Sequence, residues 1–444
     1  MLALLGAGPA FGAETTAAPP ALIEQIKHPV SWFEWGGDFR WRHEYMDNGI
    51  TVNRDLPQNI QSYQRYRARI WGQASLRTNF LFKTRLAAEP RLFFEPYPTY
   101  SSGLDWGEGV IDNLYFQWSR PASLPVVFKV GRQDVFLGNG WLMADGTPLD
   151  GSRTYFVDAA RATVSWDAAN TTADLFYIDH GAWNDRWLPP INHLRKPWVE
   201  QDERGAAVWL ANRSLPDMEL DGFFFYKHDY HPVRPAPAGS KGDLYTIGPR
   251  IVWDAGGPWQ CRVEGAFQWG EKNGNDVEAY GANARLTYRF NDPWKNQVWL
   301  AYEHLSGDDP STSKNEEFDL LWGRWPRWSE LYIYSVFLET RPSQISNLNR
   351  LGPGWQCSPA PWLTTSLEYA ALFADQEAPA VSALRPQIFS RRGDFRGHFL
   401  RGAIKCRFNK HWSGHLWGEV VFPGDFYTTR EPLTFLRAQM MFVF

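Results

Sequence analysis

Arg65, Arg67 and Arg69 recur at every second position, and this spacing places three guanidinium groups on one face of an extended strand. Lys83 and Arg85 repeat the pattern a few residues later. A guanidinium group is a flat, permanently charged fork that suits carboxylates, so the chemistry expected here is anion binding. These five cations have few acidic neighbours in the sequence, and we expect them to form a basic stripe across two strands.

Some lumen arginines have a simpler structural explanation, because an arginine opposite a carboxylate can brace the wall of a barrel. The sequence offers such neighbours in two places: Asp38, Arg40, Arg42 and Glu44 in the first, and Arg262 with Glu264 in the second. The same strand faces nevertheless carry more cations than anions. That excess favours anion binding, although the whole chain has 45 basic and 49 acidic residues.

Catalytic and metal-binding chemistry has less support. The 10 histidines are scattered, and no HExxH, CxxC, GxSxG or glycine-rich phosphate loop occurs. The groups His228–His231 and Asp179–His180 lie beside predicted loops, where a metal site or a hydrolase is conceivable but loop or girdle residues are commoner. Asp308 and Asp309 offer oxygen ligands for Ca²⁺, but two adjacent carboxylates favour a solvated turn. We predict no catalytic residue, no metal ion and no cofactor.

A period of two in hydropathy predicts the elements that position these cations. Tyr66, Ala68 and Ile70 alternate with the arginines of the first stripe. The segment Leu433–Phe444 alternates to the end of the chain and finishes on an aromatic residue. Segments of about ten residues with one apolar face and one polar face are typical of membrane β-strands, with lipid outside and water inside.

Composition supports this interpretation. The chain has 444 residues, 24 Trp, 16% aromatic residues and a net charge of -4, and its mean hydropathy is -0.43. No apolar run approaches the roughly eighteen residues of a transmembrane helix, which excludes a helical bundle. Abundant Trp and Tyr suit the aromatic girdles of a barrel, whereas an aromatic-rich soluble β protein is the alternative. Three cysteines cannot form a complete disulfide framework.

The connections predict the topology. Short turns, rich in Asn, Asp, Gly and Pro, are expected at 77–79, 167–171, 254–258, 291–295 and 409–411. Longer links are expected at 46–62, 92–111, 134–156, 180–203, 231–243, 306–329 and 374–397. The fold class is therefore all-β: a transmembrane antiparallel β-barrel of about eighteen strands, with short periplasmic turns, long extracellular loops and both termini in the periplasm.

Three segments stand apart from this pattern. Residues 1–13 resemble a signal peptide without its basic region, and 14–30 are expected to be flexible, so that the barrel covers 31–444. The link 342–360 is too long for a periplasmic turn. It is expected to fold into the pore as a plug, unless the strand count slips there, and the loop 134–156 is a second candidate for occluding the pore.

The ordered stretches WGGDFRWRHE (35–44), QRYRARIW (64–71), FKVGRQDVFLGNG (128–140), LDGSRTYFVDAAR (149–161) and EHLSGDDP (303–310) resemble the alginate-export family of outer-membrane porins. The terminal GEVVFPGDFYTT and FLRAQMMFVF extend this resemblance over the whole region 35–444. It implies a monomeric barrel in the bacterial outer membrane with an electropositive, anion-selective pore. Through that pore a polyuronate such as alginate would leave the cell.

Strand parity and the resemblance together give a set of basic residues expected to line the path of the solute. They are Arg40, Arg42, Arg65, Arg67, Arg69, Lys83, Arg85, Lys129, Arg132, Arg153, Arg161, Arg250, Arg285 and Arg437. Arg132 shares the parity of the outward Val130 and would face lipid unless the strand bulges after Gly131. Expected partners are an anionic polysaccharide or a small anionic solute, membrane lipid and periplasmic export machinery, but no nucleic acid. A porin for small anionic or sugar-like solutes is the alternative, and an outer-membrane enzyme is less favoured.

Overall fold

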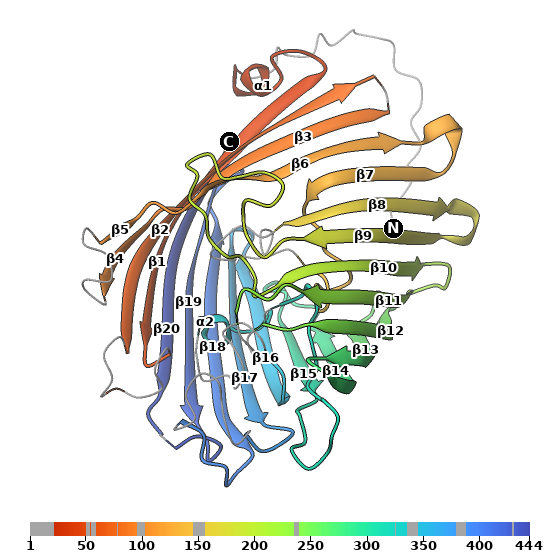
Figure 1. The fold of residues 1–444 in the computed structure, drawn as a ribbon. Helices are drawn as coiled ribbons and strands as arrows, with labels where there is room; N and C mark the ends of the chain where they lie inside the picture. Colours follow the sequence, from red (N-terminus) through yellow and green to blue (C-terminus); the bar gives the residue numbers. More distant parts are fainter. Residues whose placement is uncertain are drawn as a thin grey trace.

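The computed structural model describes residues 22–49, 54, 59–77, 79–95, 103–144, 156–234, 239–324, 326–334, 345–378, 388–428 and 430–444 (Figure 1). The strands are β1 (Phe33–Asp47), β2 (Ile60–Leu76), β3 (Phe80–Ala88), β4 (Arg91–Glu95), β5 (Leu104–Asp105), β6 (Gly109–Ser119), β7 (Val126–Gln133), β8 (Val157–Trp166), β9 (Thr171–His180), β10 (Asp202–Asn212), β11 (Met218–Tyr230), β12 (Gly242–Asp254), β13 (Trp259–Lys272), β14 (Asn275–Arg289), β15 (Gln297–Leu305), β16 (Leu348–Ala360), β17 (Leu363–Phe373), β18 (Phe395–Arg407), β19 (Trp412–Pro423) and β20 (Leu433–Val443). The helices are α1 (Leu22–Lys27), α2 (Leu331–Tyr334) and the short 3₁₀ turns Pro121–Ser123 and Asp167–Ala169.

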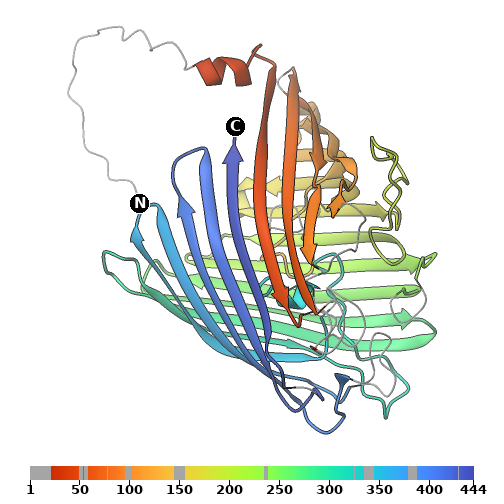
Figure 2. The ribbon, with the colours of Figure 1, turned by 90° about the vertical axis from the view of Figure 1, so that its left-hand side faces the viewer.

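The strands close into one antiparallel barrel (Figure 2). Within the described residues they occupy eighteen positions in the wall, because β3 and β4 follow one another along β2, and β6 and β5 follow one another beside them. Closure joins the ends of the chain, since β1 pairs with β20 from Asp38 opposite Val443 to Asp47 opposite Thr434. The predicted fold class and the alternating C-terminal strand are confirmed.

The two faces of the wall follow the predicted parity. Apolar residues such as Ile70, Ile247 and Leu436 are about half exposed on the outer face. Their neighbours Arg65 and Arg437 are buried inside. An exposed apolar band on the outside of a closed barrel is stable in hydrocarbon, whereas the backbone polar groups pair along the strands.

One segment of the predicted topology is wrong. Residues 348–360, expected to be a turn or a plug, form the wall strand β16, which pairs with β15 and β17. The long connection instead runs from β15 to β16, and its residues 331–334 are the helix α2 rather than part of a strand. The number of wall strands still agrees with the prediction, because β16, later in the sequence, replaces the strand that was expected earlier.

Residues 306–334 are here called the inner segment, and their second half, from Phe318 onward, folds into the barrel. Residue 325 lies outside the described part. Phe318, Leu320 and Trp322 of this segment form one buried apolar cluster with Trp141 and Met143 of the β7–β8 connection. The barrel therefore contains a hydrophobic core on one side of its lumen. Of the predicted loop 134–156, residues 145–155 lie outside the described residues.

A glycine in the wall makes the docking of the inner segment possible. A Cβ atom added at Gly205 on β10 would lie 2.3 Å from Cη2 of Trp322. The indole ring therefore lies directly on the strand backbone, which no other residue type would permit at this position.

The helix α1 and the C-terminal residue lie at the same rim of the barrel, here called the C-terminal rim (Figure 2). Trp35 Nε1 donates a hydrogen bond of 2.6 Å to the carbonyl oxygen of Ile26, which fastens α1 to β1. None of the helices in the described residues has the length and apolar character needed to cross a membrane.

Candidate functional site

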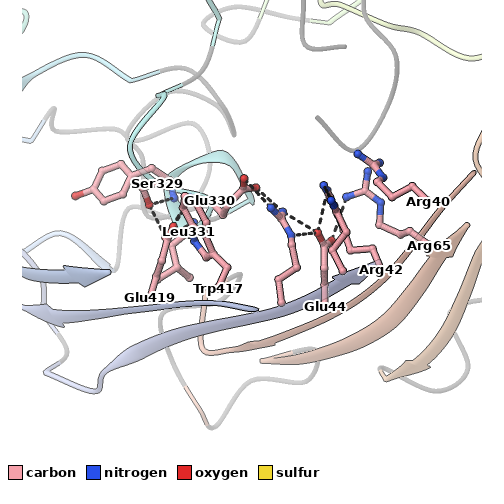
Figure 3. A network of polar contacts seen from close by, with 12 residues as sticks. Arg40, Arg42, Glu44, Arg65, Ser329, Glu330, Leu331, Trp417 and Glu419 are labelled. Carbon is pink, nitrogen blue, oxygen red and sulfur yellow. Dashed lines mark hydrogen bonds and ion pairs between the residues drawn. The ribbon is translucent and has the colours of Figure 1, made fainter. Parts of the chain in front are cut away.

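The inner segment crosses the lumen between opposite parts of the wall. Arg324 Nη2 lies 2.5 Å from Glu203 Oε2 on β10. At the other end, the backbone N–H groups of Glu330 and Leu331 donate to the Glu419 carboxylate on β19 at 2.9 to 3.0 Å (Figure 3). Because β10 and β19 lie on opposite sides of the eighteen-stranded wall, the inner segment divides the lumen and narrows the space available to a solute.

A buried ionic network joins β1, β2 and β20 beneath the end of this segment (Figure 3). Glu44 accepts hydrogen bonds from Arg65 at 3.1 Å and from Arg437 at 2.7 Å, and Arg42 lies 3.4 Å away. Arg437 also binds both carboxylate oxygens of Glu330 on the inner segment, at 2.7 and 2.9 Å. A fork matched to two oxygens fixes the geometry, so this network anchors the inner segment to the wall.

The basic stripe has more acidic neighbours than the sequence suggested. Asp38 binds Arg69 at 2.7 Å and Arg67 at 3.2 Å. Glu89, which follows β3, lies 2.6 Å from Arg65 and 2.5 Å from Arg40. The expectation of few acidic neighbours is therefore wrong for this part of the wall, because carboxylates from neighbouring strands and connections reach it.

Arg85 is neutralised as well. Its Nε atom donates to Asp112 at 2.7 Å, and both terminal nitrogens donate to Asp134 at 2.9 Å. Two of the other predicted cations have the same character: Arg161 pairs with Asp174 at 2.8 Å, and Arg250 pairs with Asp221 at 2.6 Å. Removing one member of such a buried pair leaves an uncompensated charge, which typically costs about 3–5 kcal/mol.

Other inward cations have no carboxylate partner. Lys83 lies 5.0 Å from the ring centroid of Trp71, and Lys129 lies 4.6 Å from that of Tyr115. Arg285 lies 4.0 Å above the ring of Trp299. Within the described part of the chain none of these three forms an ion pair, so each keeps its full charge toward the lumen while an aromatic ring holds it in place.

Arg262 belongs to this group, although it was a candidate for bracing with Glu264. Among the described residues it forms no ion pair, and its buried Nε atom has no hydrogen-bond partner. In the pairing of β13 with β14, Arg262 lies directly opposite Arg285. The wall therefore contains two adjacent guanidinium groups that form no ion pair with a carboxylate in the described structure.

The two remaining predicted residues differ from the rest. Arg132 pairs with Leu114 and Asp158 in an unbroken register, so it shares the parity of the outward Val130 and no bulge turns it inward. It is nonetheless buried near the end of β7, where Asp158 accepts its Nε–H at 3.0 Å and the ring of Phe156 lies 3.7 Å away. Arg153 lies outside the described residues.

Sequence reasoning missed the carboxylates that complete the network and the arginines of the adjoining wall. Glu330 and Glu419 come from parts of the chain far from their partners, and no local spacing connects them. Arg350 and Arg401 both bind Glu368, at 2.7 and 2.6 Å. The alternation of β18 marks Arg401 as an inward residue, whereas Arg350 was hidden because its strand looked like a turn.

The two histidine groups meet on one face of the wall, because Arg204 on β10 lies opposite both Asp179 and His228 and forms an ion pair with Asp179. His228 Nδ1 lies 2.9 Å from Asp243 Oδ1, but Asp229 points to the opposite face of β11 and is buried with Lys227. Asp309 accepts a hydrogen bond from the backbone N–H of Ser311, as expected of a turn. Among the described residues, no group of three or more His, Cys, Asp or Glu side chains is arranged to hold a metal ion.

A family model described as alginate export matches residues 31–440. The chain belongs to the alginate export family. No protein of curated function matches it. The family and the barrel fold together identify this chain as a porin of the bacterial outer membrane. Its apolar outer face lies toward lipid.

Solved structures of porins share this fold at low sequence identity. A BenF-like porin from Pseudomonas fluorescens Pf-5 is 10% identical, with a TM-score of 0.59 over 93% of this chain and 99% of the porin. Pseudomonas aeruginosa OccK9 (OpdG) is 10% identical, with a TM-score of 0.57 over 92% of this chain and 98% of OccK9. Pseudomonas aeruginosa OccK7 (OpdD) is 10% identical, with a TM-score of 0.56 over 94% of this chain and 99% of OccK7. These likenesses concern the fold alone.

Proposed function

We propose that this outer-membrane porin exports an anionic polysaccharide, a polyuronate such as alginate, passively through an electropositive lumen. The observation that carries the proposal is a group of inward cations without a carboxylate partner in the described structure, among them Lys83, Lys129, Arg262 and Arg285. The braced arginines carry little net charge to the solute, because their carboxylates lie within hydrogen-bond distance. The solute would therefore interact mainly with these unpaired cations.

The physical basis is field focusing in a narrow passage. The low-dielectric wall confines the field of the lining charges, which raises the local concentration of anions. For a polymer to move through the pore, each contact must be weak and similar contacts must recur along the path. The polymer can then release one contact while other contacts still hold it. Separate unpaired cations on β3, β7 and β13–β14 meet that requirement better than one cluster of arginines that are already paired with carboxylates.

The proposed partners follow from this role. The cargo supplies repeated carboxylates, lipid surrounds the wall, and periplasmic polymer-handling machinery delivers the chain to a single barrel that acts as a monomer. Most of the short turns, such as those between β2 and β3 and between β16 and β17, lie at the C-terminal rim, so this rim would face the periplasm and receive the polymer. Passive transport of this kind requires no cofactor and no catalytic residue.

A second candidate function is diffusion of small anionic or sugar-like solutes. The inner segment favours it, because it spans the lumen from β10 to β19 and reduces the free cross-section. The two functions share the same unpaired cations. They differ in whether a polymer can pass the inner segment.

Single-channel recording with oligouronates tests the proposal and separates these functions. We expect a long oligouronate added at the C-terminal rim to block the current, and the double variant Lys83→Glu and Lys129→Glu to weaken that block by tenfold or more. Lys295→Glu, the same charge change in the turn between β14 and β15, serves as the control and should leave the block intact. An oligomer that never blocks, while a monomer permeates freely, would favour the second function.

A further inference from the structure

A recess of about 260 Å³ lies between the inner segment and the wall formed by β13 to β18. Trp328 of the inner segment covers it, and the guanidinium groups of four wall strands line it. The lining residues used below are Arg262, Arg285, Trp299, Trp328, Arg350 and Arg401. Of these lining residues, Arg285 belongs to the predicted solute path, whereas Arg350 and Arg401 do not.

The carboxylates of the recess are already occupied. Glu368 accepts hydrogen bonds from Arg350 at 2.7 Å and from Arg401 at 2.6 Å. Glu303 accepts the indole N–H of Trp328 at 2.7 Å. Neither acid forms an ion pair with Arg262 or Arg285 in the described structure, and neither does Glu264, which is buried on the same face of β13. The two guanidinium charges therefore have no carboxylate partner within ion-pair distance among the described residues.

These two charges lie directly opposite one another in the register of β13 and β14. Like charges in this arrangement repel and destabilise a sheet. The buried Nε atom of Arg262 also lacks a hydrogen-bond partner, and a buried donor without a partner is unfavourable. An anion placed between the two guanidinium groups would remove both defects.

Arg285 is held in position for such an anion. Its guanidinium group lies 4.0 Å from the ring centroid of Trp299. The ring in turn lies against Gly354 of β16, where an added Cβ atom would be 2.1 Å from Cε2 of Trp299. With glycine behind the ring and the cation in front of it, Arg285 cannot turn away without losing its cation–π contact.

We propose that this recess binds one carboxylate-bearing sugar ring, a single uronate unit, whose carboxylate bridges Arg262 and Arg285. The apolar face of the ring packs against Trp328, as aromatic side chains combine an apolar body with a polar edge. The volume lies just below the range of about 300–1,000 Å³ for small-molecule sites, which suits one ring and not a polymer segment. The inference rests on the proposed acidic-saccharide cargo and adds a site for a free monomer or for the end of a chain.

A ligand bound in the recess would contact the inner segment directly. Trp328 donates to Glu303, and its carbonyl oxygen accepts a hydrogen bond of 2.9 Å from Arg401. The next residue, Ser329, donates to Glu419 at 2.7 Å. A sugar ring beneath Trp328 therefore contacts the same short stretch of chain that fastens the inner segment to the wall.

Calorimetric titration of the detergent-solubilised full chain with monomeric mannuronate tests the site. We expect saturable binding, no binding of neutral mannose, and a loss of affinity of tenfold or more in Arg262→Gln and in Arg285→Gln. Arg289→Gln is the matched control, because Arg289 lies on the same strand and face as Arg285 but is paired with Asp254. It should bind mannuronate like the unaltered protein.

Folding of the variants provides an independent readout. Removing one of two opposed like charges should leave the thermal unfolding temperature of Arg262→Gln unchanged or higher in the absence of sugar. Adding mannuronate should raise that temperature in the unaltered protein only. No saturable mannuronate binding, or equal binding in Arg262→Gln, would overturn the inference.

The two proposals fail separately. If long oligouronates block the channel but monomeric mannuronate does not bind, the recess is not a uronate site and the export proposal stands. If the monomer binds and binding requires Arg262 and Arg285, yet oligouronates never block the current, the recess stands and export of a polymer is contradicted. A monomer with a free reducing end and a terminally capped dimer distinguish free-monomer binding from capture of a chain end.

Discussion

Two regions of the wall place arginine directly opposite arginine, and their surroundings differ. In β1–β2, Arg42 lies opposite Arg65, and Glu44 binds one and lies close to the other. In β13–β14, Arg262 lies opposite Arg285, and Glu264, two residues after Arg262 on the same face, forms no ion pair with either in the described structure. The local sequence pattern is the same in both regions, so strand parity alone does not decide whether a lumen cation is neutralised.

The difference shows how one wall can combine stability with anion affinity. The carboxylates of the first region let several buried arginines lie side by side and fasten the inner segment through Arg437 and Glu330. The second region instead places its cations over aromatic rings, which position the charge but do not cancel it. We infer that the first region holds the barrel together and that the second contacts the solute.

The largest expected effect comes from breaking the first region. Glu44→Gln leaves Arg42, Arg65 and Arg437 buried around a neutral amide, so the free energy of unfolding should fall by about 3–5 kcal/mol. Urea unfolding of the detergent-refolded barrel measures this change. Glu34→Gln on the same strand is the control, because among the described residues Glu34 forms no ion pair; equal losses in both variants would contradict the bracing role.

A converse change should make the second region resemble the first. Ala301 on β15 lies beside Arg285 in the register, and Ala301→Asp would supply the missing carboxylate. We expect the anion preference of the channel to fall and mannuronate binding to weaken by tenfold or more, since the new acid competes with the sugar. Ala301→Asn has the same size without the charge, and identical behaviour of the two variants would show that charge is not the cause.

A smaller effect is expected from Asp38→Asn, which frees Arg67 and Arg69 from their shared acid. The stability should fall by about 1–3 kcal/mol, because two donors lose a charged acceptor, and the anion preference should rise. Asp47→Asn is the matched control, since Asp47 pairs with the exposed Arg54, and such surface pairs contribute about 0–1 kcal/mol. An unchanged zero-current potential in Asp38→Asn would show that pairing with a carboxylate is not what separates the arginines of the first region from those of the second.

The smallest change should come from salt. Raising the ionic strength from about 0.1 M to about 1 M shortens the Debye length from roughly 10 Å to roughly 3 Å. The charges that face water should be screened, so ion selectivity should decline, whereas the buried pairs should keep the unfolding temperature nearly constant. A large drop in that temperature, with selectivity preserved, is the opposite of what the comparison predicts.

Much of the barrel could be predicted from the sequence, because parity and turn composition are local signals. Ile70 and Arg65 take the faces that the alternation assigns, and the C-terminal strand closes on β1. β16 was missed because Gly352, Pro353 and Gly354 interrupt it, and these residues normally mark turns. Pairing with β15 overrides that local preference.

The site was less predictable, because its electrostatics depend on contacts between distant residues. Arg437 meets Glu44 and Glu330 only after the barrel closes and the inner segment folds inward. The cations on β3 and β13–β14 were visible as inward charges, but their neutralisation was not: Arg85 gains two acids, whereas Arg262 keeps none. Sequence spacing thus identifies the face of a charge better than its partners.

The zero-current potential across a planar bilayer under a salt gradient tests most directly whether unpaired cations face a water-filled passage. We predict that the unaltered barrel prefers anions, and that replacing Lys83, Lys129, Arg262 and Arg285 by glutamine together removes most of the preference without unfolding the wall. An unaltered barrel that prefers cations, or a fourfold variant that keeps the full anion preference, would contradict it.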